Sequence, residues 1–351
     1  MRPVSFLAVV VIASVAICAH AQTSQSAESY VSRGNDRYSR GDLDGAIDDF
    51  GIAITFDPKW AAAYDFRAAA FYSKGNLSAA IADYSRAIEL NPRFAAAYND
   101  RGIAEKANGD LEAAIADYDT AIKLRPRFAA AFSNRGNARL ARGDLEGAVG
   151  DFNKAIQINP DFAEAYFNRG NARQIQGKLD AAIADYTKAI QLKPDMSQAW
   201  CNRANARNSH GEPDQALADS NQAIKLNPAS AEPYSARGVA RRRKGDLDGA
   251  LADFDKAIEL DPKVAVFHNN RGNALMIKND LEAAIAEYSM AIEIDPEQTE
   301  IYLNRGHAKL LMGRATEAES DFAESLRTAG SRRQVIQQLI QEYKKSGAQM
   351  R

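Results

Sequence analysis

The sequence predicts an all-α solenoid of about nine helix-turn-helix repeats, each 34 residues long, followed by a C-terminal capping helix. Two observations carry this prediction. Prolines recur every 34 residues, at positions 58, 92, 126, 160, 194, 228, 262 and 296. When repeats are counted from residue 27, the twentieth position of all nine is alanine, at 46, 80, 114, 148, 182, 216, 250, 284 and 318. A period of this length is typical of stacked helical hairpins.

Each repeat is expected to form two antiparallel helices. In the third repeat these are predicted at 95–107 and 111–124, and apolar residues in the second recur at intervals of three and four, which marks one stripe of a helix. Between them, Gly109 tolerates a positive φ and Asp110 suits an N-cap. Pro126 follows the second helix, which it cannot continue. Because one hairpin cannot bury its own stripe, the repeats must stack.

The predicted domain organisation has four parts. Residues 1–21 combine a charged start, an apolar run and the small-x-small site Ala19-His20-Ala21, which is the pattern of a cleavable signal peptide. Residues 22–26 form a polar linker, and 333–351 form a C-terminal capping helix and tail. The repeats occupy 27–332, divided as 27–60, 61–94, 95–128, 129–162, 163–196, 197–230, 231–264, 265–298 and 299–332.

The signal peptide predicts a periplasmic or secreted protein, the alternative being a membrane anchor formed by an uncleaved signal. No membrane insertion is expected after cleavage. The 44 basic and 46 acidic side chains give a net charge of −2, which supplies no long-range field for nucleic acid. Two cysteines exclude a disulfide framework.

The chain resembles the tetratricopeptide repeat (TPR) family, in its secreted bacterial type, over residues 27 to about 330. The family pattern Trp-x2-Leu-Gly-x2-Tyr, Ala-x3-Phe, Pro is met here as Tyr-x2-Arg-Gly, Ala-x3-Tyr/Phe, Pro. The resemblance implies a right-handed superhelix whose first helices line a concave side. It also implies a non-catalytic scaffold that binds an extended peptide or protein segment there. The alternative is a module that binds a glycan or another polar ligand in the same place.

One departure from the family pattern is an arginine at the seventh position of every repeat, where leucine is common. The twenty-third position is acidic in every repeat, so we interpret the two rows as ion pairs between the paired helices rather than as a ligand site. The arginines are Arg33, Arg67, Arg101, Arg135, Arg169, Arg203, Arg237, Arg271 and Arg305; the acids are Asp49, Asp83, Asp117, Asp151, Asp185, Asp219, Asp253, Glu287 and Asp321.

Asparagine recurs at the sixth and ninth positions of the first helices, which the resemblance places on the concave side. An amide both donates and accepts, so such a row can bind the backbone of an extended peptide. The alternative is that the amides bridge neighbouring first helices. The row lapses in the seventh repeat, where two arginines suggest a subsite for an acidic group. The candidate binding residues are Asn134, Asn137, Asn168, Asn171, Asn202, Asn205, Asn270, Asn273, Asn304, Arg242 and Arg243.

The sequence offers no catalytic motif, so we predict no enzyme, no cofactor and no metal site. Phosphate loops, paired metal-binding histidines and nucleophile elbows are all missing. Cys201 lacks a repeated histidine or acid as a base, which favours a buried thiol. After the ninth repeat, residues 331–346 are expected to form a helix whose apolar side, from Val335 to Tyr343, covers the last repeat. A second copy of the chain, associating end to end with the array, is an alternative partner.

Overall fold

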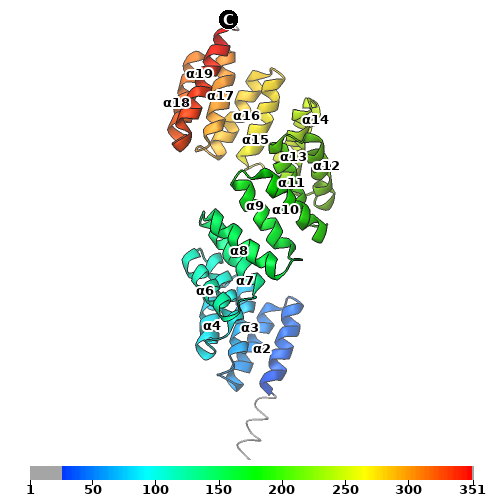
Figure 1. The fold of residues 1–351 in the computed structure, drawn as a ribbon, viewed down its shortest axis with the longest axis vertical. Helices are drawn as coiled ribbons and strands as arrows, with labels where there is room; N and C mark the ends of the chain where they lie inside the picture. The colour runs from blue at the N-terminus through cyan, green and yellow to red at the C-terminus, as the bar shows by residue number, and fades with distance from the viewer. Residues whose placement is uncertain (1–25, 350–351) are drawn as a thin grey trace, which may run out of the picture. The chain divides into compact units, whose positions relative to one another are not determined.

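The computed structural model describes residues 26–349, and within them helices are the only regular secondary structure, as predicted. The helices alternate between the first and second member of each repeat (Figure 1). The first helices are residues 26–39, α3 (Ala61–Ser73), α5 (Ala95–Ala107), α7 (Ala129–Ala141), α9 (Ala163–Ile175), α11 (Ser197–His210), α13 (Glu232–Arg243), α15 (Ala265–Ile277) and α17 (Thr299–Leu311). The second helices are α2 (Leu43–Phe56), α4 (Leu77–Leu90), α6 (Leu111–Leu124), α8 (Leu145–Ile158), α10 (Leu179–Leu192), α12 (Pro213–Leu226), α14 (Leu247–Leu260), α16 (Leu281–Ile294) and α18 (Ala315–Thr328).

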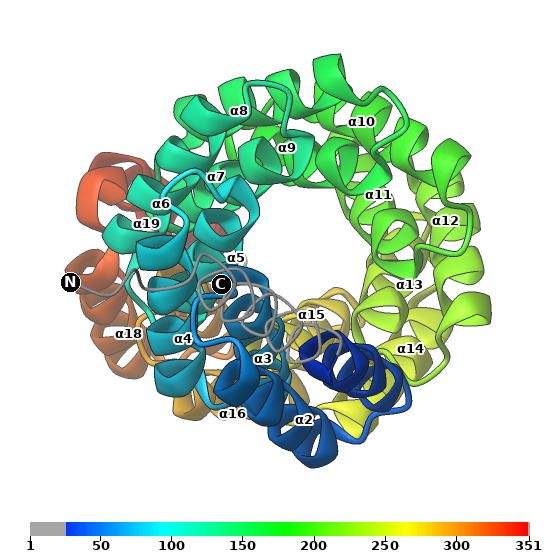
Figure 2. The same ribbon diagram turned by 90° about the horizontal axis from the view of Figure 1, so that it is seen from below.

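The chain divides into two compact units, a first unit up to Ala172 and a second unit from Arg173 onward. In the first unit, α3 contacts α5 and α5 contacts α7; in the second, α11 contacts α13 and α13 contacts α15. Figure 2 shows α5 and α7 on the inner side of the curve of the first unit, with α6 and α8 outside them. It shows α11 and α13 likewise inside α12 and α14 in the second unit. The first helices therefore form the inner face of each unit.

The turn inside each repeat follows the expected chemistry. Gly109 has a φ of 93°, and Asn279 takes the same place in the eighth repeat with a φ of 63°. Asparagine is one of the few other residues that enters this region readily. The side chain of Asp110 accepts a hydrogen bond of 2.9 Å from the backbone N–H of Ala113, which caps α6. The predicted bounds of both helices in the third repeat are confirmed.

Close packing inside a repeat depends on a small residue at the eighth position opposite an aromatic ring at the twenty-fourth. A Cβ added at Gly102 would lie 2.8 Å from Cε1 of Tyr118, and one added at Gly136 would lie 2.7 Å from Cε1 of Phe152. Both rings are fully buried. Loss of such a ring costs about 3–5 kcal/mol because the surrounding helices cannot close the cavity.

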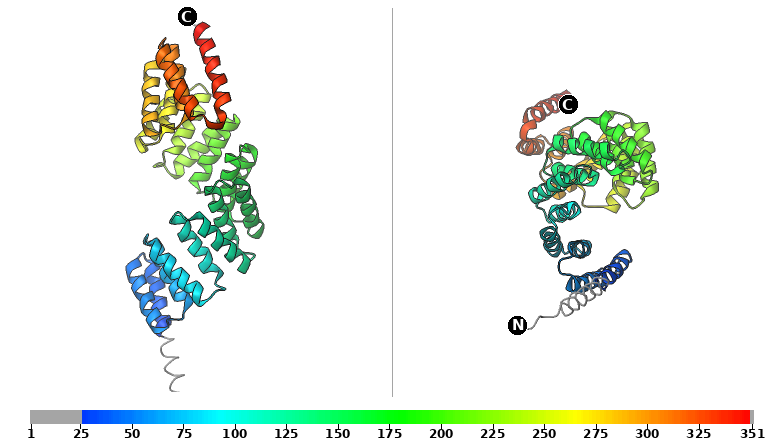
Figure 3. Two further views of the ribbon diagram at one scale, coloured as in Figure 1. Left: turned by 90° about the vertical axis from the view of Figure 1, so that its left-hand side faces the viewer. Right: turned by 60° about the horizontal axis from the view of Figure 1, so that its bottom comes forward.

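The last repeat is covered as predicted. A short 3₁₀ turn, Gly330–Arg332, leads into α19 (Arg333–Gln349), which lies beside α17 and α18 (Figure 3). Ile336 and Ile340 are buried against the end of the array, and the ring of Tyr343 stacks on His307 with centroids 3.8 Å apart. The expectation is wrong for Val335, which is 56% exposed because it lies on the solvent side of α19.

The predicted signal peptide, residues 1–21, lies outside the described residues, as does most of the predicted linker. Among residues 26–349, no helix combines the length and the apolar character that a bilayer crossing requires.

Candidate functional site

The predicted ion pairs between the two helices of a repeat are present in repeats one to four and six to nine. The closest nitrogen–oxygen distances between the seventh-position arginine and the twenty-third-position acid are 2.5–2.7 Å. In most of these pairs two guanidinium nitrogens reach both carboxylate oxygens, as Arg203 does with Asp219 at 2.8 and 2.7 Å. This bidentate geometry is the strongest form of the interaction.

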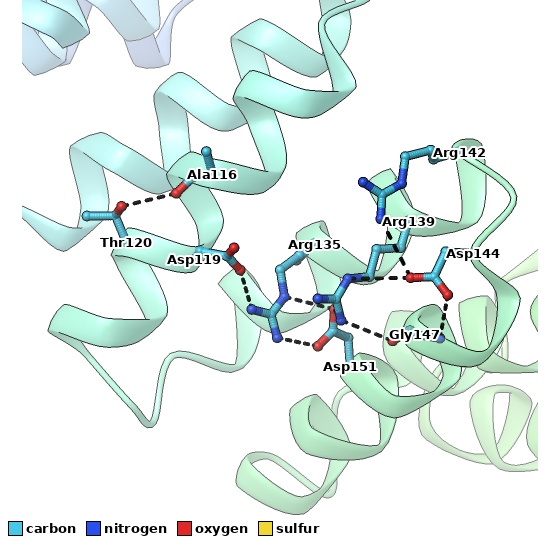
Figure 4. Close-up of polar contacts among 9 residues, drawn as sticks. All are labelled: Ala116, Asp119, Thr120, Arg135, Arg139, Arg142, Asp144, Gly147 and Asp151. Carbon is cyan, nitrogen blue, oxygen red and sulfur yellow. Dashed lines mark hydrogen bonds and ion pairs between the residues drawn. The ribbon is translucent and has the colours of Figure 1, made fainter.

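A second cation often shares the same carboxylate. In the fourth repeat, Asp151 accepts from Arg135 and also from Nη1 of Arg139, at 2.9 Å (Figure 4). Arg207 does the same for Asp219 at 2.7 Å, from the eleventh position of the sixth repeat. The eleventh position, where the family has tyrosine, is often charged, and its part in the ion pairs was not predicted from the sequence.

The seventh-position arginines also join neighbouring repeats. Arg135 pairs with Asp119 of the preceding repeat (Figure 4). Nη1 of Arg101 donates to Oγ of Ser85 at 3.0 Å. Each of these guanidinium groups lies over the aromatic ring at the fourth position, and the distance from Arg203 to the Trp200 ring centroid is 4.9 Å. These arginines bond both within a repeat and to the preceding repeat, so they hold the array together.

The predicted asparagines all lie on first helices and are half-buried. In the first unit they are on α7 (Asn134, Asn137) and α9 (Asn168, Asn171). In the second unit they are on α11 (Asn202, Asn205), α15 (Asn270, Asn273) and α17 (Asn304). The structure therefore places them on the inner face of each unit.

Several sixth-position amides bridge neighbouring first helices. Nδ2 of Asn134 donates to Oδ1 of Asn99 at 3.0 Å, from the sixth position of one repeat to the fifth of the preceding one. The same relation joins Asn270 to Oγ of Ser235 at 3.3 Å. It also joins Asn304 to Oδ1 of Asn269, at 3.1 Å. At these places the amides satisfy the array, as the bridging alternative predicts.

The remaining amides differ in how far they are engaged. Oδ1 of Asn273 accepts from the hydroxyl of Tyr288 at 2.8 Å, and Asn205 makes only a long contact of 3.9 Å to Sγ of Cys201. Asn137 and Asn168, by contrast, have no side-chain hydrogen bond to the described part of the chain and are half-buried. Their donors and acceptors are therefore open to a ligand on the inner face of the first unit.

The two arginines of the seventh repeat, on α13, have different surroundings. Arg243 is exposed, whereas Arg242 is half-buried and its Nε is buried without a hydrogen-bond partner among residues 26–349. Burial and the neighbouring Arg243 lower the pKa of Arg242. Unlike the seventh-position arginines, this cation pairs with no carboxylate of residues 26–349, and an acidic group would compensate it.

Two carboxylates on the inner face of the first unit escaped the sequence analysis. Asp65 on α3 and Asp100 on α5 occupy the fifth and sixth positions of successive repeats, where the next pair of repeats carries the amides Asn99 and Asn134. Burial, and then the charge of Asp100, raise the pKa of Asp65 to about 7. Burial raises the pKa of Asp100 as well. The available signal was an acid at the sixth position, which holds asparagine in five other repeats.

Other reactive side chains are structural. Burial raises the pKa of the Cys201 thiol to about 12, which disfavours the reactive thiolate. Nδ1 of His268 lies 2.9 Å from Oε2 of Glu287, so the histidine joins the pairing layer of the eighth repeat. Among the described residues, no group of three or more His, Cys, Asp or Glu side chains is placed to hold a metal ion.

Comparison with known proteins identifies similar repeats along most of the chain. A model described as TPR repeat matches residues 68–108, 104–141, 136–177, 240–276 and 272–313. Two models described as Tetratricopeptide repeat match residues 163–196 and 197–230. No curated protein matches the sequence.

Solved structures share the fold at low sequence identity. The crystal structure of the APC/C hetero-tetramer Cut9–Hcn1 is 16% identical, with a TM-score of 0.61, and covers 90% of this chain and 76% of its own. A tetratricopeptide repeat protein from Parabacteroides merdae is 21% identical, with a TM-score of 0.55, over 72% of this chain and 99% of its own. Pseudomonas aeruginosa pilF is 20% identical, with a TM-score of 0.55, over 60% and 96% respectively.

Proposed function

Because the chain belongs to the tetratricopeptide repeat family, we propose that it is a scaffold that binds an extended peptide segment of a partner protein on its inner faces. Repeats of this family typically mediate protein–protein interactions and are usually non-catalytic. The observation that carries the peptide-binding mode is the pair of unengaged amides, Asn137 and Asn168, on the inner face of the first unit. An extended peptide exposes N–H and C=O groups along its length, and each amide can bind both kinds.

The amides that bridge first helices support the same mode indirectly. The bridge from Asn134 to Asn99 fixes the rotamers of both side chains. A face whose polar groups are already fixed loses less entropy when a ligand binds. The bridging and ligand-binding roles are therefore divided between neighbouring asparagines of α7, at the sixth and ninth positions.

In the second unit, Arg242 is proposed to bind an acidic group of the partner. Its buried Nε lacks an acceptor among the described residues, and a carboxylate would supply both the acceptor and the opposite charge. An Arg242→Gln variant is expected to lose selectivity for acidic peptides while keeping its fold, because no ion pair inside the protein is broken.

The proposal is tested by a crosslinking pull-down of the chain, beginning at Gln22, from an extract of exported proteins. The Asn137→Ala/Asn168→Ala variant is expected to lose capture while keeping its melting temperature within about 2 °C, since neither amide bonds to the described protein. The Asn134→Ala variant serves as the control: it breaks the bridge to Asn99 and is expected to lower the melting temperature. Capture that survives the double substitution would overturn the assignment of these amides. A glycan array tests the polar-ligand alternative.

We also propose that the protein works in the periplasm or outside the cell. The support is the pattern of residues 1–21 described above. Cell fractionation with N-terminal sequencing is expected to find a soluble exported chain that begins at Gln22. A chain retained in membranes with Met1 intact would instead show an uncleaved anchor.

A further inference from the structure

Asp65 and Asp100 are two carboxylates on the inner face of the first unit, and neither pairs with a lysine or arginine of the described residues. Oδ1 of Asp65 is buried and has no hydrogen-bond partner among the described residues. Asp100 accepts a hydrogen bond of 2.9 Å from Nδ2 of Asn99. A neutral amide donor satisfies geometry but brings no charge, so burial continues to disfavour the ionised form of both carboxyl groups.

The repeat geometry brings these two carboxylates side by side. In the next pair of repeats, the sixth-position residue Asn134 bonds to the fifth-position residue Asn99 at 3.0 Å. Asp100 and Asp65 occupy the same two positions, one repeat earlier, and are likewise 35 residues apart. Two ionised carboxylates have no donor hydrogen between them, so the bridge that holds the amide pair together is missing when both are charged.

A buried hydroxyl group lies near Asp100. Tyr118 is fully buried, and its Oη has no hydrogen-bond partner among residues 26–349. At the equivalent position, the hydroxyls of Tyr186 and Tyr288 reach the inner-face residues Gln174 and Asn273 of their own repeats, each at 2.8 Å.

The pKa shifts of two buried tyrosines report which charges lie near them. The pKa of Tyr118 is raised by burial, by Tyr72 and by the carboxylates Asp117 and Asp100. Tyr84, at the same position of the second repeat, has its pKa raised by burial and then by Asp100 and Asp65. Tyr84 therefore lies within electrostatic range of both carboxylates, and Tyr118 within range of Asp100.

We propose that Asp65, Asp100 and Tyr118 bind the cationic side chain of a lysine or arginine in the partner segment. This inference rests on the proposed peptide-binding function and names one of the residues that the segment must carry. An ammonium or guanidinium group supplies several donors to oxygens that lack them, together with the missing positive charge.

The test selects peptides and then examines one contact within them. A display library of random 12-residue peptides is selected against the chain that begins at Gln22, and the enriched sequences are read. The expected result is a lysine or arginine at one fixed position of the enriched family. A lysine peptide from this family and its norleucine analogue are then titrated by fluorescence anisotropy, with citrulline replacing arginine if arginine is selected.

A double-mutant cycle locates that cation on the protein. Norleucine is expected to weaken binding to the original chain at least tenfold, and Asp65→Asn/Asp100→Asn is expected to weaken the lysine peptide by a similar factor. The norleucine peptide should bind both proteins equally, because the contact has already been removed. The matched control, Asp36→Asn/Asp48→Asn, removes two exposed carboxylates of the same unit and should leave both titrations unchanged.

A third variant tests the hydroxyl. Tyr118→Phe keeps the buried ring and removes only Oη, so the fold should be retained, and binding of the lysine peptide should weaken several-fold. Unchanged binding by this variant would remove Tyr118 from the site. Enriched peptides without a basic residue, or a cycle without coupling, would overturn the cation site and leave peptide binding intact. If no peptide is enriched, peptide binding itself is overturned and the cation site with it.

Discussion

Two layers of the first helices behave differently along the chain. The seventh position is arginine in every repeat, and its partner at the twenty-third position is always an acid. The fifth and sixth positions, one helical step away, hold amides in one pair of repeats (Asn99 and Asn134) and carboxylates in the pair before it (Asp65 and Asp100). The constant layer is electrically neutral and bonded within the protein, whereas the variable layer leaves charges and donors open on the inner face. Under the proposed function, stability and recognition are assigned to adjacent but separate positions.

The most severe way to break the constant layer is to remove a carboxylate that two arginines share. Asp219→Ala leaves Arg203 and Arg207 without their acid, and Arg203 is only 7% exposed. The expected loss of unfolding free energy is about 3–5 kcal/mol, because a buried charge stays uncompensated. Urea unfolding followed by circular dichroism measures it.

The control for that prediction is Asp214→Ala, which removes a surface ion pair with Lys244. The side chain of Asp214 is 76% exposed. Its expected loss is under about 1 kcal/mol. Equal losses for the two variants would contradict a special role for the buried layer.

A second prediction concerns the packing that lets the two layers form. Gly136→Ala places a Cβ 2.7 Å from Cε1 of the buried Phe152, and is expected to cost about 1–3 kcal/mol by overpacking. Gly150→Ala provides a matched comparison inside α8, where an added Cβ meets nothing within 4 Å. This variant should gain about 0.5–1 kcal/mol from reduced backbone entropy of the unfolded chain. If both substitutions change the thermal midpoint in the same direction, close approach at Gly136 is not the cause.

A third prediction sharpens the comparison through pH. The pKa of Asp65 rises from its ordinary value of 3.8 to about 7 on folding, so the folded chain holds the proton more tightly than the unfolded chain. The contribution of this carboxyl to stability is therefore favourable at pH 4 and is lost as pH rises toward about 7. Asp65→Asn should be about 1–2 kcal/mol more stable than the parent at pH 8, and equally stable at pH 4. A stability gain that does not change with pH would show that the charge of Asp65 is already compensated.

The smallest expected effects separate two asparagines on one helix. Asn134→Ala breaks the bridge to Asn99 and should cost about 1 kcal/mol. Asn137→Ala breaks no hydrogen bond with the described residues and should change stability by less than about 0.5 kcal/mol. Differential scanning calorimetry of both variants decides the matter, and equal losses would mean that Asn137 is also part of the structure.

Much of the fold could be predicted from spacing. The proline period predicted both helices of the third repeat at their observed bounds. The rows of arginines and acids predicted the ion pairs, such as that of Arg101 with Asp117. The reach of one guanidinium to three groups was not predictable, because the contact of Arg101 with Ser85 depends on how closely consecutive repeats stack. Val335 was assigned to the wrong side of α19 for a similar reason. The sequence shows five apolar residues from Val335 to Tyr343 but not which of them lie at the solvent edge of the apolar side.

The candidate site shows the same division between periodicity and packing. Periodicity along the chain determined that the asparagines share the inner faces of the first helices, because a 34-residue repeat returns each position to the same place on its hairpin. Only the tertiary structure decided which amides are engaged and which carboxylates lack a partner. A hydrogen bond depends on the side chain that stands opposite in the next repeat, so Asn134 finds Asn99 while Asp100 meets Asp65. Burial, which raises the pKa of Asp65, also belongs to the stacked array and not to any single repeat.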